Sequence, residues 1–328
     1  MTRALVVGTG QVGTRVARQL VDTPGIDEVL LAGRDPKVVE QLRVAFNGRA
    51  RAVAFAPGDE IPADADVVVT ALPAEFDHPV VAAAIERGVP VASATDEHEA
   101  LDQLRALAPN AERAATTVAV GCGLAPGLAD VLARHAASLF DTVDEIRISR
   151  TGWAGPACVA TARHERRALV HSWRGGGWHE DRPQGDVLVW FPEPIGGRDC
   201  RPVTGATALL VDAFPGVGRI GVQIGEPPPR GRVRRRGLDP EWGGARVEVR
   251  GRRSGGFETV VYGVVERTGV AAGVVLGVVA ARLAGALGDR LERPGVHGLA
   301  ALVEPVPFLT ELAERGVRAA VFEGVSVG

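Results

Sequence analysis

Residues 3–20 have the sequence RALVVGTGQVGTRVARQL, and the rest of the chain is interpreted from this stretch. Its apolar run Ala4–Val7 is rich in β-branched residues, which predicts a buried parallel strand. Gly8, Gly10 and Gly13 follow with the spacing G-x-G-x-x-G, and the apolar residues after them recur with helical period. A strand, a glycine turn and a helix in this order form the dinucleotide-binding fingerprint.

Each glycine of this turn has a physical task. Gly8 makes the tight turn, Gly10 lets backbone N–H groups approach a pyrophosphate, and Gly13 lets the helix pack closely on the strand. The phosphates would lie at the free N–H groups and the positive dipole end of the helix. The residues of this turn predicted to bind the dinucleotide are Gly8, Thr9, Gly10, Gln11, Val12 and Gly13.

Composition limits the class of protein. A chain of 328 residues suggests two domains, and its formal net charge of −3 carries no global signal for nucleic acid. Its three cysteines have no metal-ligand spacing, so we expect no metal site and a reduced, cytoplasmic setting. Lys37 is the only lysine and Tyr262 the only tyrosine, which excludes a tyrosine–lysine pair of the short-chain dehydrogenase kind.

The end of the second predicted strand, 29–32, bears on the choice of cofactor. An acidic residue about 20 positions past the glycine turn binds the adenosine ribose in NAD-binding domains, whereas an arginine accommodates a 2′-phosphate. Here Gly33 stands at the acidic position, with Arg34 beside it. Because glycine leaves room for a phosphate and arginine neutralises it, we predict NADP(H) in preference to NAD(H). Asp35 complicates this prediction, since it could still turn toward the ribose.

Further apolar runs predict the remaining strands of an open parallel sheet. Residues 50–55, 66–73, 89–93 and 116–120 are read as strands, with helices between them. Ligands of such a sheet lie outside the carboxyl ends of the strands. Ala71, Leu72, Pro73 and Thr95 are therefore candidates for packing beside the cofactor, and Asp96 is a candidate proton donor. Alternatively, the residues after 94 only cap the helix over 97–107 and supply its acidic first turn.

A second glycine-rich turn, Gly123-Leu-Ala-Pro-Gly127, follows the sixth strand, and Gly123 and Pro126 are candidates for substrate contact. Together with the segments already described, this turn resembles the saccharopine dehydrogenase and lysine 6-dehydrogenase family. The segments that carry the resemblance are 8–13, 66–73, 84–91, 123–127, 190–196, 261–266 and 316–323. They extend over nearly the whole chain and are most similar before residue 140.

The resemblance implies an α/β fold of three parts. These are a Rossmann domain over 1–122, an inserted mixed α+β domain for substrate binding and dimer contacts over 123–265, and a C-terminal segment, 266–328, that packs back on the Rossmann domain. It also implies a homodimer and hydride transfer at a C–N carbon through an imine. The sequence departs from the NAD-using lysine 6-dehydrogenases, which have an acid where Gly33 stands.

Residues 158–171 are predicted to form a helix in the inserted domain. Thr161, His164, Ala168 and His171 would share one face of it. Because histidine titrates near neutral pH, His164 and then His171 are candidate proton donors. Arg163 and Arg174 are candidates for holding a substrate carboxylate, and Trp173 for lining a pocket. The alternative is a solvated helix with ordinary charges and a buried aromatic anchor.

Two unusual stretches are assigned structural roles. Residues 230–253 contain nine arginines, and the alternation at Ala245–Val249 predicts a solvated edge strand rather than a nucleic-acid or acidic-partner surface. The apolar residues 270–287 predict a buried helix on the nucleotide domain rather than a membrane span, with Gly273 and Gly277 allowing close approach.

The sequence thus predicts an NADP(H)-dependent oxidoreductase of the saccharopine dehydrogenase type that acts on a small amino-acid-derived substrate. An enoyl reductase acting on C=C is one alternative. A regulator that senses NADP(H) without catalysis is another, and it would keep the glycine turn. No nucleic acid or membrane partner is expected.

Overall fold

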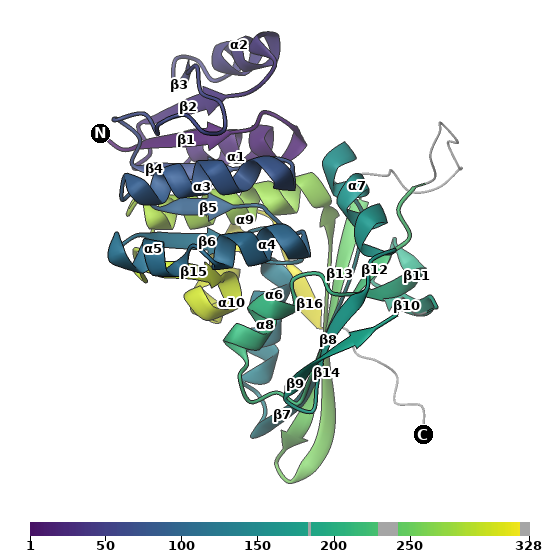
Figure 1. Ribbon diagram of the computed structural model, residues 1–328. Helices are drawn as coiled ribbons and strands as arrows, with labels where there is room; N and C mark the ends of the chain where they lie inside the picture. Colours follow the sequence, from purple (N-terminus) through teal and green to yellow (C-terminus); the bar gives the residue numbers. More distant parts are fainter. Residues whose placement is uncertain (183–184, 229–241, 322–328) are drawn as a thin grey trace. The chain divides into compact units, whose positions relative to one another are not determined.

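The computed structural model describes residues 1–182, 185–228 and 242–321, which form two compact units (Figure 1). Unit 1 consists of Met1–Gly123 and Gly269–Val303, and unit 2 contains Leu124–Thr268 and the residues from 304 onward. The prediction that all of 266–328 returns to the first domain is wrong for 304–321. These residues belong to unit 2, because helix α11 (Pro305–Glu314) contacts helix α6 (Leu128–Ala137) and strand β16 (Ala319–Val321) pairs with β14 (Gly256–Arg267).

Unit 1 is built on a parallel sheet with strand order β3-β2-β1-β4-β5-β6-β15. The order reverses between β1 and β4, as in the doubly wound dinucleotide-binding fold, so the predicted α/β class is confirmed. The seventh strand, β15, was not foreseen. The strands are β1 (Arg3–Val7), β2 (Glu28–Ala32), β3 (Ala50–Ala52), β4 (Val67–Thr70), β5 (Val91–Ser93), β6 (Thr117–Val120) and β15 (Gly295–Gly298).

Helices cover both faces of this sheet (Figure 1). They are α1 (Gln11–Val21), α2 (Pro36–Ala45), the short helix η1 (Ala74–Phe76), α3 (Asp77–Glu86), α4 (His98–Arg105), α5 (Ala108–Arg113), α9 (Thr268–Leu283) and α10 (Leu299–Leu302). Strands β1 and β2 are buried from their second residue to their last, which agrees with a sheet covered on both sides.

Helix α9 packs against helix α1 through two glycines. A Cβ on Gly273 would lie 2.4 Å from the Cβ of Arg15, and one on Gly277 would lie 2.8 Å from the Cβ of Gln19. These distances are too short for any side chain, so the close helix contact predicted at these glycines is present. No helix in the described parts of the chain is both long enough and apolar enough to span a membrane.

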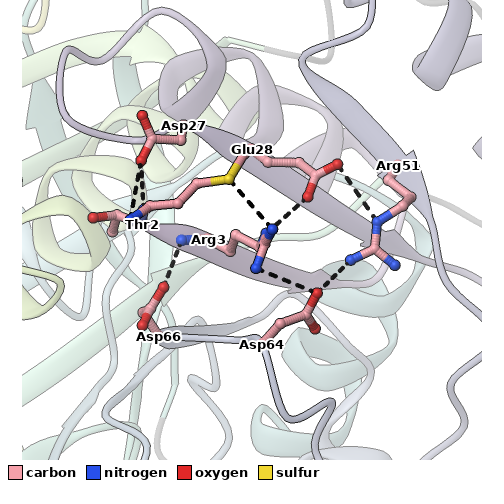
Figure 2. A network of polar contacts seen from close by, with 8 residues as sticks. Thr2, Arg3, Asp27, Glu28, Arg51, Asp64 and Asp66 are labelled. Atoms are coloured by element: carbon pink, nitrogen blue, oxygen red, sulfur yellow. Dashed lines mark hydrogen bonds and ion pairs between the residues drawn. The ribbon is translucent and has the colours of Figure 1, made fainter.

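A network of ion pairs lies where β1, β2 and β3 begin (Figure 2). Arg3 Nε lies 3.0 Å from a Glu28 oxygen, Arg51 Nη2 lies 2.6 Å from Asp64 Oδ2, and Arg51 Nε lies 3.5 Å from Glu28. The Asp66 carboxylate also accepts a hydrogen bond from the backbone N–H of Arg3. These charges hold the amino ends of the strands, so they lie at the edge of the sheet opposite the glycine turn.

Unit 2 is a mixed sheet with the path β10-β11-β12-β7-β13-β14-β16, from which β8 and β9 branch beside β12. Helix α6 contacts β7, β13 and β14. The strands are β7 (Thr142–Thr151), β8 (Val170–Arg174), β9 (Gly177–Asp181), β10 (Val187–Phe191), β11 (Gly196–Val203), β12 (Arg219–Gly225), β13 (Trp242–Arg253), β14 (Gly256–Arg267) and β16, and the remaining helices are α7 (Pro156–Glu165) and α8 (Thr207–Ala213).

The predicted edge strand at Ala245–Val249 is wrong in its position. It lies within β13, which pairs with β7 on one side and β14 on the other, and its apolar residues are buried. Three of the four arginines of β13 form ion pairs within the unit: Arg246 with Glu248, Arg250 with Glu145 and Glu248, and Arg253 with Glu258. Residues 229–241 of the arginine-rich stretch lie outside the described residues.

Candidate functional site

The glycine turn lies at the switch point between β1 and β4, where open α/β sheets bind their ligands. Gly8 has φ +108°, and a Cβ on it would lie 2.4 Å from the carbonyl oxygen of Ala71. A Cβ on Gly13 would lie 1.8 Å from the carbonyl oxygen of Gly8. A Cβ on Gly10 would meet no atom within 4 Å, and Gly10 is exposed. Gly8 and Gly13 are thus required for the packing of the fold, whereas the absence of a side chain at Gly10 leaves open space beside the turn.

The N-terminus of α1 is open to an anion. Its N-cap residue, Gly10, offers no side chain to its N–H groups, and the first helical turn contains no acidic residue. Gln11 is exposed and Val12 is half-buried at this end. The helix dipole and the uncapped N–H groups make this terminus suitable for a phosphate group.

The loop after β2 places the three residues predicted to select the cofactor. Arg34 is exposed and forms no ion pair or hydrogen bond with the rest of the described chain. Asp35 caps α2, because its Oδ1 accepts a hydrogen bond of 2.9 Å from the backbone N–H of Lys37. This competes with the alternative that Asp35 turns toward a ribose.

Gly33 does not provide the space for a phosphate that the sequence predicts at this position. The space that its missing side chain leaves is filled by Thr9: a Cβ on Gly33 would lie 2.4 Å from Thr9 Oγ1 and 2.9 Å from Thr9 Cγ2. Gly33 therefore does not leave room for a phosphate at its own Cβ position. What remains for a phosphate in this loop is the exposed guanidinium of Arg34.

The carboxyl ends of β4 and β5 hold a buried polar cluster that the sequence analysis missed. Asp77, at the start of α3, is 1% exposed and accepts hydrogen bonds of 2.5 Å from the hydroxyls of both Ser93 and Thr95. Burial raises the pKa of Asp77, and the hydroxyls of Ser93, Thr70 and Thr95 oppose this by stabilising the ionised form. The only signal in the sequence was a polar residue at or just beyond each of two buried strands.

This cluster fixes the loops at the predicted cofactor edge. The Thr95 hydroxyl donates a hydrogen bond to Asp77, and the Thr95 backbone N–H donates one of 3.1 Å to Ser93 Oγ. The Thr95 side chain therefore has a structural role. Ala71, Leu72 and Pro73 follow β4 and are half-buried, beside the Gly8 turn through the hydrogen bond from Ala71 N to Val7 O. Asp96 lies half-buried directly after Thr95.

The predicted helix over 158–171 is wrong in its second half. Helix α7 ends at Glu165, and His171 lies on β8, where its backbone N–H donates to Thr204 Oγ1 at 2.8 Å. His164 is exposed on the last turn of α7, so His164 and His171 do not share a helical face. His171 Nε2 lies 3.5 Å from a carboxylate oxygen of Glu180.

The predicted substrate contacts of unit 2 are engaged within the unit. Arg174 donates two hydrogen bonds, of 2.9 and 2.8 Å, to Asp181, and Trp173 donates from Nε1 to the carbonyl of Val217. Trp173 also stacks edge-on against Trp178, with 5.5 Å between ring centroids. Arg163 donates to the carbonyl of Pro228 at 2.6 Å. The geometry of Trp173 and Arg174 is that of structural anchors.

The second glycine-rich turn leads into α6 through a buried acid. Gly123 donates its N–H to the carbonyl of Gly121, and Pro126 follows a cis peptide bond. Asp130 accepts a hydrogen bond of 3.1 Å from Gly127 N, and burial raises its pKa to about 7. Among the described residues, no three histidine, cysteine, aspartate or glutamate side chains gather as a metal site.

Comparisons with known proteins agree with this architecture. Residues 3–120 match the profile of the semialdehyde dehydrogenase NAD-binding domain. The solved structure of saccharopine dehydrogenase (L-Glu forming) from Saccharomyces cerevisiae matches with a TM-score of 0.70 and 14% identity, over 98% of this chain and 100% of its own.

Two further structures are similar at lower scores. Amine dehydrogenase from Mycobacterium smegmatis matches with a TM-score of 0.56 and 14% identity, over 92% of this chain and 96% of its own. GenD2 from gentamicin A biosynthesis, solved in complex with NAD, matches with a TM-score of 0.52 and 18% identity, over 98% of this chain and 97% of its own. The fold implied by the resemblance to saccharopine dehydrogenase is confirmed, and the family-model match over residues 3–120 supports a nicotinamide dinucleotide as the ligand of unit 1.

Proposed function

We propose that this protein is an NADP(H)-dependent oxidoreductase that transfers hydride at the C–N carbon of a small amino-acid-derived substrate. The observation that carries the dinucleotide part is the uncapped N-terminus of α1 beside the Gly8 turn, in a fold shared with dehydrogenases. The preference for NADP(H) rests on Arg34, an exposed guanidinium at the end of β2 without a partner among the described residues.

The residues of unit 1 would bind and orient the cofactor. The backbone N–H groups around Gly10 and the dipole of α1 would hold the pyrophosphate, and Arg34 the 2′-phosphate. Ala71, Leu72 and Pro73 would line the cofactor, in a loop that Asp77 fixes through Ser93 and Thr95. When bound, the nicotinamide supplies or accepts the hydride, and the protein contributes orientation and exclusion of water.

A proton must also reach the nitrogen of an amine or imine substrate. His164 remains the first candidate as donor because its side chain is exposed and histidine is a common general acid, followed by His171 and Asp96. We also propose that the protein is a cytoplasmic homodimer, as the family resemblance implies. Light scattering at two protein concentrations tests the dimer.

Arg34→Ala tests the cofactor preference. We expect the wild-type protein to bind NADPH more tightly than NADH, measured through the fluorescence of the reduced nicotinamide. In the variant, loss of a charge-assisted phosphate contact should weaken NADPH alone, by about 10- to 100-fold. Arg43→Ala is the matched control, since it removes a charge on α2 that is paired with Glu40 at 2.7 Å. Equal losses of both cofactors in Arg34→Ala would refute the role of Arg34.

The type of reaction is tested by stopped-flow oxidation of NADPH. One panel contains cyclic and open-chain imines with a carboxylate, and a second contains enoyl thioesters. We expect turnover with imines. Turnover with the thioesters alone would make the protein an enoyl reductase, and tight NADPH binding without turnover in either panel would make it a regulator.

A further inference from the structure

The side chain of Thr9 and the backbone of Gly33 are in direct contact across the glycine turn and the end of β2. A Cβ on Gly33 would lie 2.4 Å from Thr9 Oγ1, 2.9 Å from Thr9 Cγ2 and 3.1 Å from Val39 Cγ2. Gly33 does not have a positive φ, so its backbone is not in the left-handed region that favours glycine. Contact with Thr9 above all, and with Val39 Cγ2 at the longer distance of 3.1 Å, therefore restricts position 33 to glycine, rather than backbone conformation.

Thr9 cannot relieve this contact by changing its rotamer. A β-branched side chain carries two heavy atoms on Cβ, and they occupy two of the three staggered positions. In the structure both atoms face Gly33. Two of the three staggered positions face Gly33, and only one position points away from it. After any rotation of χ1 by 120°, at least one of the two heavy atoms therefore still occupies a position that faces Gly33. Every rotamer of Thr9 thus opposes a side chain at position 33.

Position 33 is where dinucleotide-binding domains of this order carry the acid that binds the ribose hydroxyls. The neighbouring acid, Asp35, is engaged as the N-cap of α2. We propose that Thr9 is a specificity-determining residue, which excludes a carboxylate from position 33 and so leaves Arg34 to select the 2′-phosphate. The proposal rests on the proposed preference for NADP(H), and it adds that the middle of the glycine turn sets this preference from 24 positions away.

The test compares wild type with Thr9→Ala, Gly33→Asp and the double variant. Thermal midpoints are followed by far-UV circular dichroism, and Kd values for NADPH and NADH by nicotinamide fluorescence. Gly33→Asp alone should lower the midpoint and weaken both cofactors. The double variant should regain the midpoint and favour NADH, which changes the ratio of the two Kd values by about 100-fold relative to wild type.

Thr9→Val/Gly33→Asp is the matched control. Valine keeps the branched shape and removes the hydroxyl, so it should not rescue Gly33→Asp if the effect of Thr9 is steric. Thr9→Ala/Gly33→Ala provides a milder pair in case the aspartate variants do not fold. Gly33→Ala should lower the midpoint, and the added Thr9→Ala should restore it.

The proposal is overturned if Gly33→Asp alone keeps the wild-type midpoint and favours NADH as strongly as the double variant. It is also overturned if the double variant folds and still prefers NADPH as wild type does. The same holds if Thr9→Ala does not restore the thermal midpoint that Gly33→Ala lowers. Failure of the proposed function is a separate result, because it is measured on the wild-type protein as equal or reversed affinities. In that case, comparing the thermal midpoints of the Gly33 variants with and without Thr9→Ala still decides whether Thr9 restricts position 33.

Discussion

Asp130→Asn should remove a pH-dependent loss of stability from unit 2. Asp130 is 3% exposed, and burial raises its pKa from 3.8 to about 7. A folded state that holds this proton more tightly than the unfolded chain loses stability as the pH rises between the two pKa values. The stability that this proton contributes should therefore be fully present below about pH 3.8, decrease through pH 5 and 6, and be lost above about pH 7. A shift of about three units corresponds to about 4 kcal/mol.

Asparagine keeps an oxygen that accepts the hydrogen bond from Gly127 N, and it does not titrate in this range. The free energy of unfolding of the variant, minus that of wild type, should thus rise by about 4 kcal/mol between pH 4 and pH 8. Effects of other titrating groups are shared by both proteins and cancel in the difference.

Urea unfolding at a series of pH values, followed by tryptophan fluorescence, measures this difference. All five tryptophans (Trp153, Trp173, Trp178, Trp190 and Trp242) lie in unit 2, so the signal reports the unit that contains Asp130. Asp144→Asn is the control, since Asp144 is exposed on β7 and its loss should give a flat difference. A flat difference for Asp130→Asn, within about 0.5 kcal/mol, would refute the reasoning.

Further predictions concern unit 1, with thermal midpoints from circular dichroism and dinucleotide Kd values from nicotinamide fluorescence. Gly10→Ala should keep the thermal midpoint and weaken dinucleotide binding at least about 10-fold, because its Cβ would enter only the open space where a pyrophosphate would lie. Gly13→Ala should weaken binding and also lower the midpoint, since its Cβ would clash with the Gly8 carbonyl oxygen. An unchanged midpoint in Gly13→Ala would contradict this. Asp77→Ala should cost about 2–4 kcal/mol by leaving two buried hydroxyls without their acceptor, and Asp77→Asn less; equal costs would argue against that hydrogen-bonded role. Arg51→Ala should cost at most about 1 kcal/mol and leave dinucleotide Kd values unchanged, because its ion pairs are partly exposed at the amino edge; a change in Kd would refute that separation.

Much of unit 1 could be predicted because its signals are local or repeated. The Gly8–Gly13 spacing lies within one turn, and strands β1, β2 and β4 are short apolar runs whose burial the structure shows. The close approach of Gly273 and Gly277 to the nucleotide domain is predictable because two glycines one helical turn apart in an apolar helix favour close packing, whereas the structure alone identifies α1 as the partner.

The errors arose where distant residues decide local structure. The residues before His171 favour a helix, but Thr204 and the pairing of β8 with β9 and β12 place His171 on a strand. Ala245–Val249 has the alternation of a strand, and alternation does not reveal which strands will lie on either side. The partners of Asp77 and the contact of Thr9 with Gly33 join residues 16 to 24 positions apart, which no local pattern contains.

The packing of α9 on α1 has a consequence for how the protein is made. The dinucleotide turn and α1 are synthesised within the first 21 residues, but the helix that covers α1 through Gly273 and Gly277 emerges from the ribosome some 250 residues later. The nascent N-terminal part therefore lacks its helical partner at Arg15 and Gln19 of α1 while all of β7 to β14 is translated between the two halves of unit 1. Unit 1 is therefore completed only after Leu124–Thr268 of unit 2 has been synthesised.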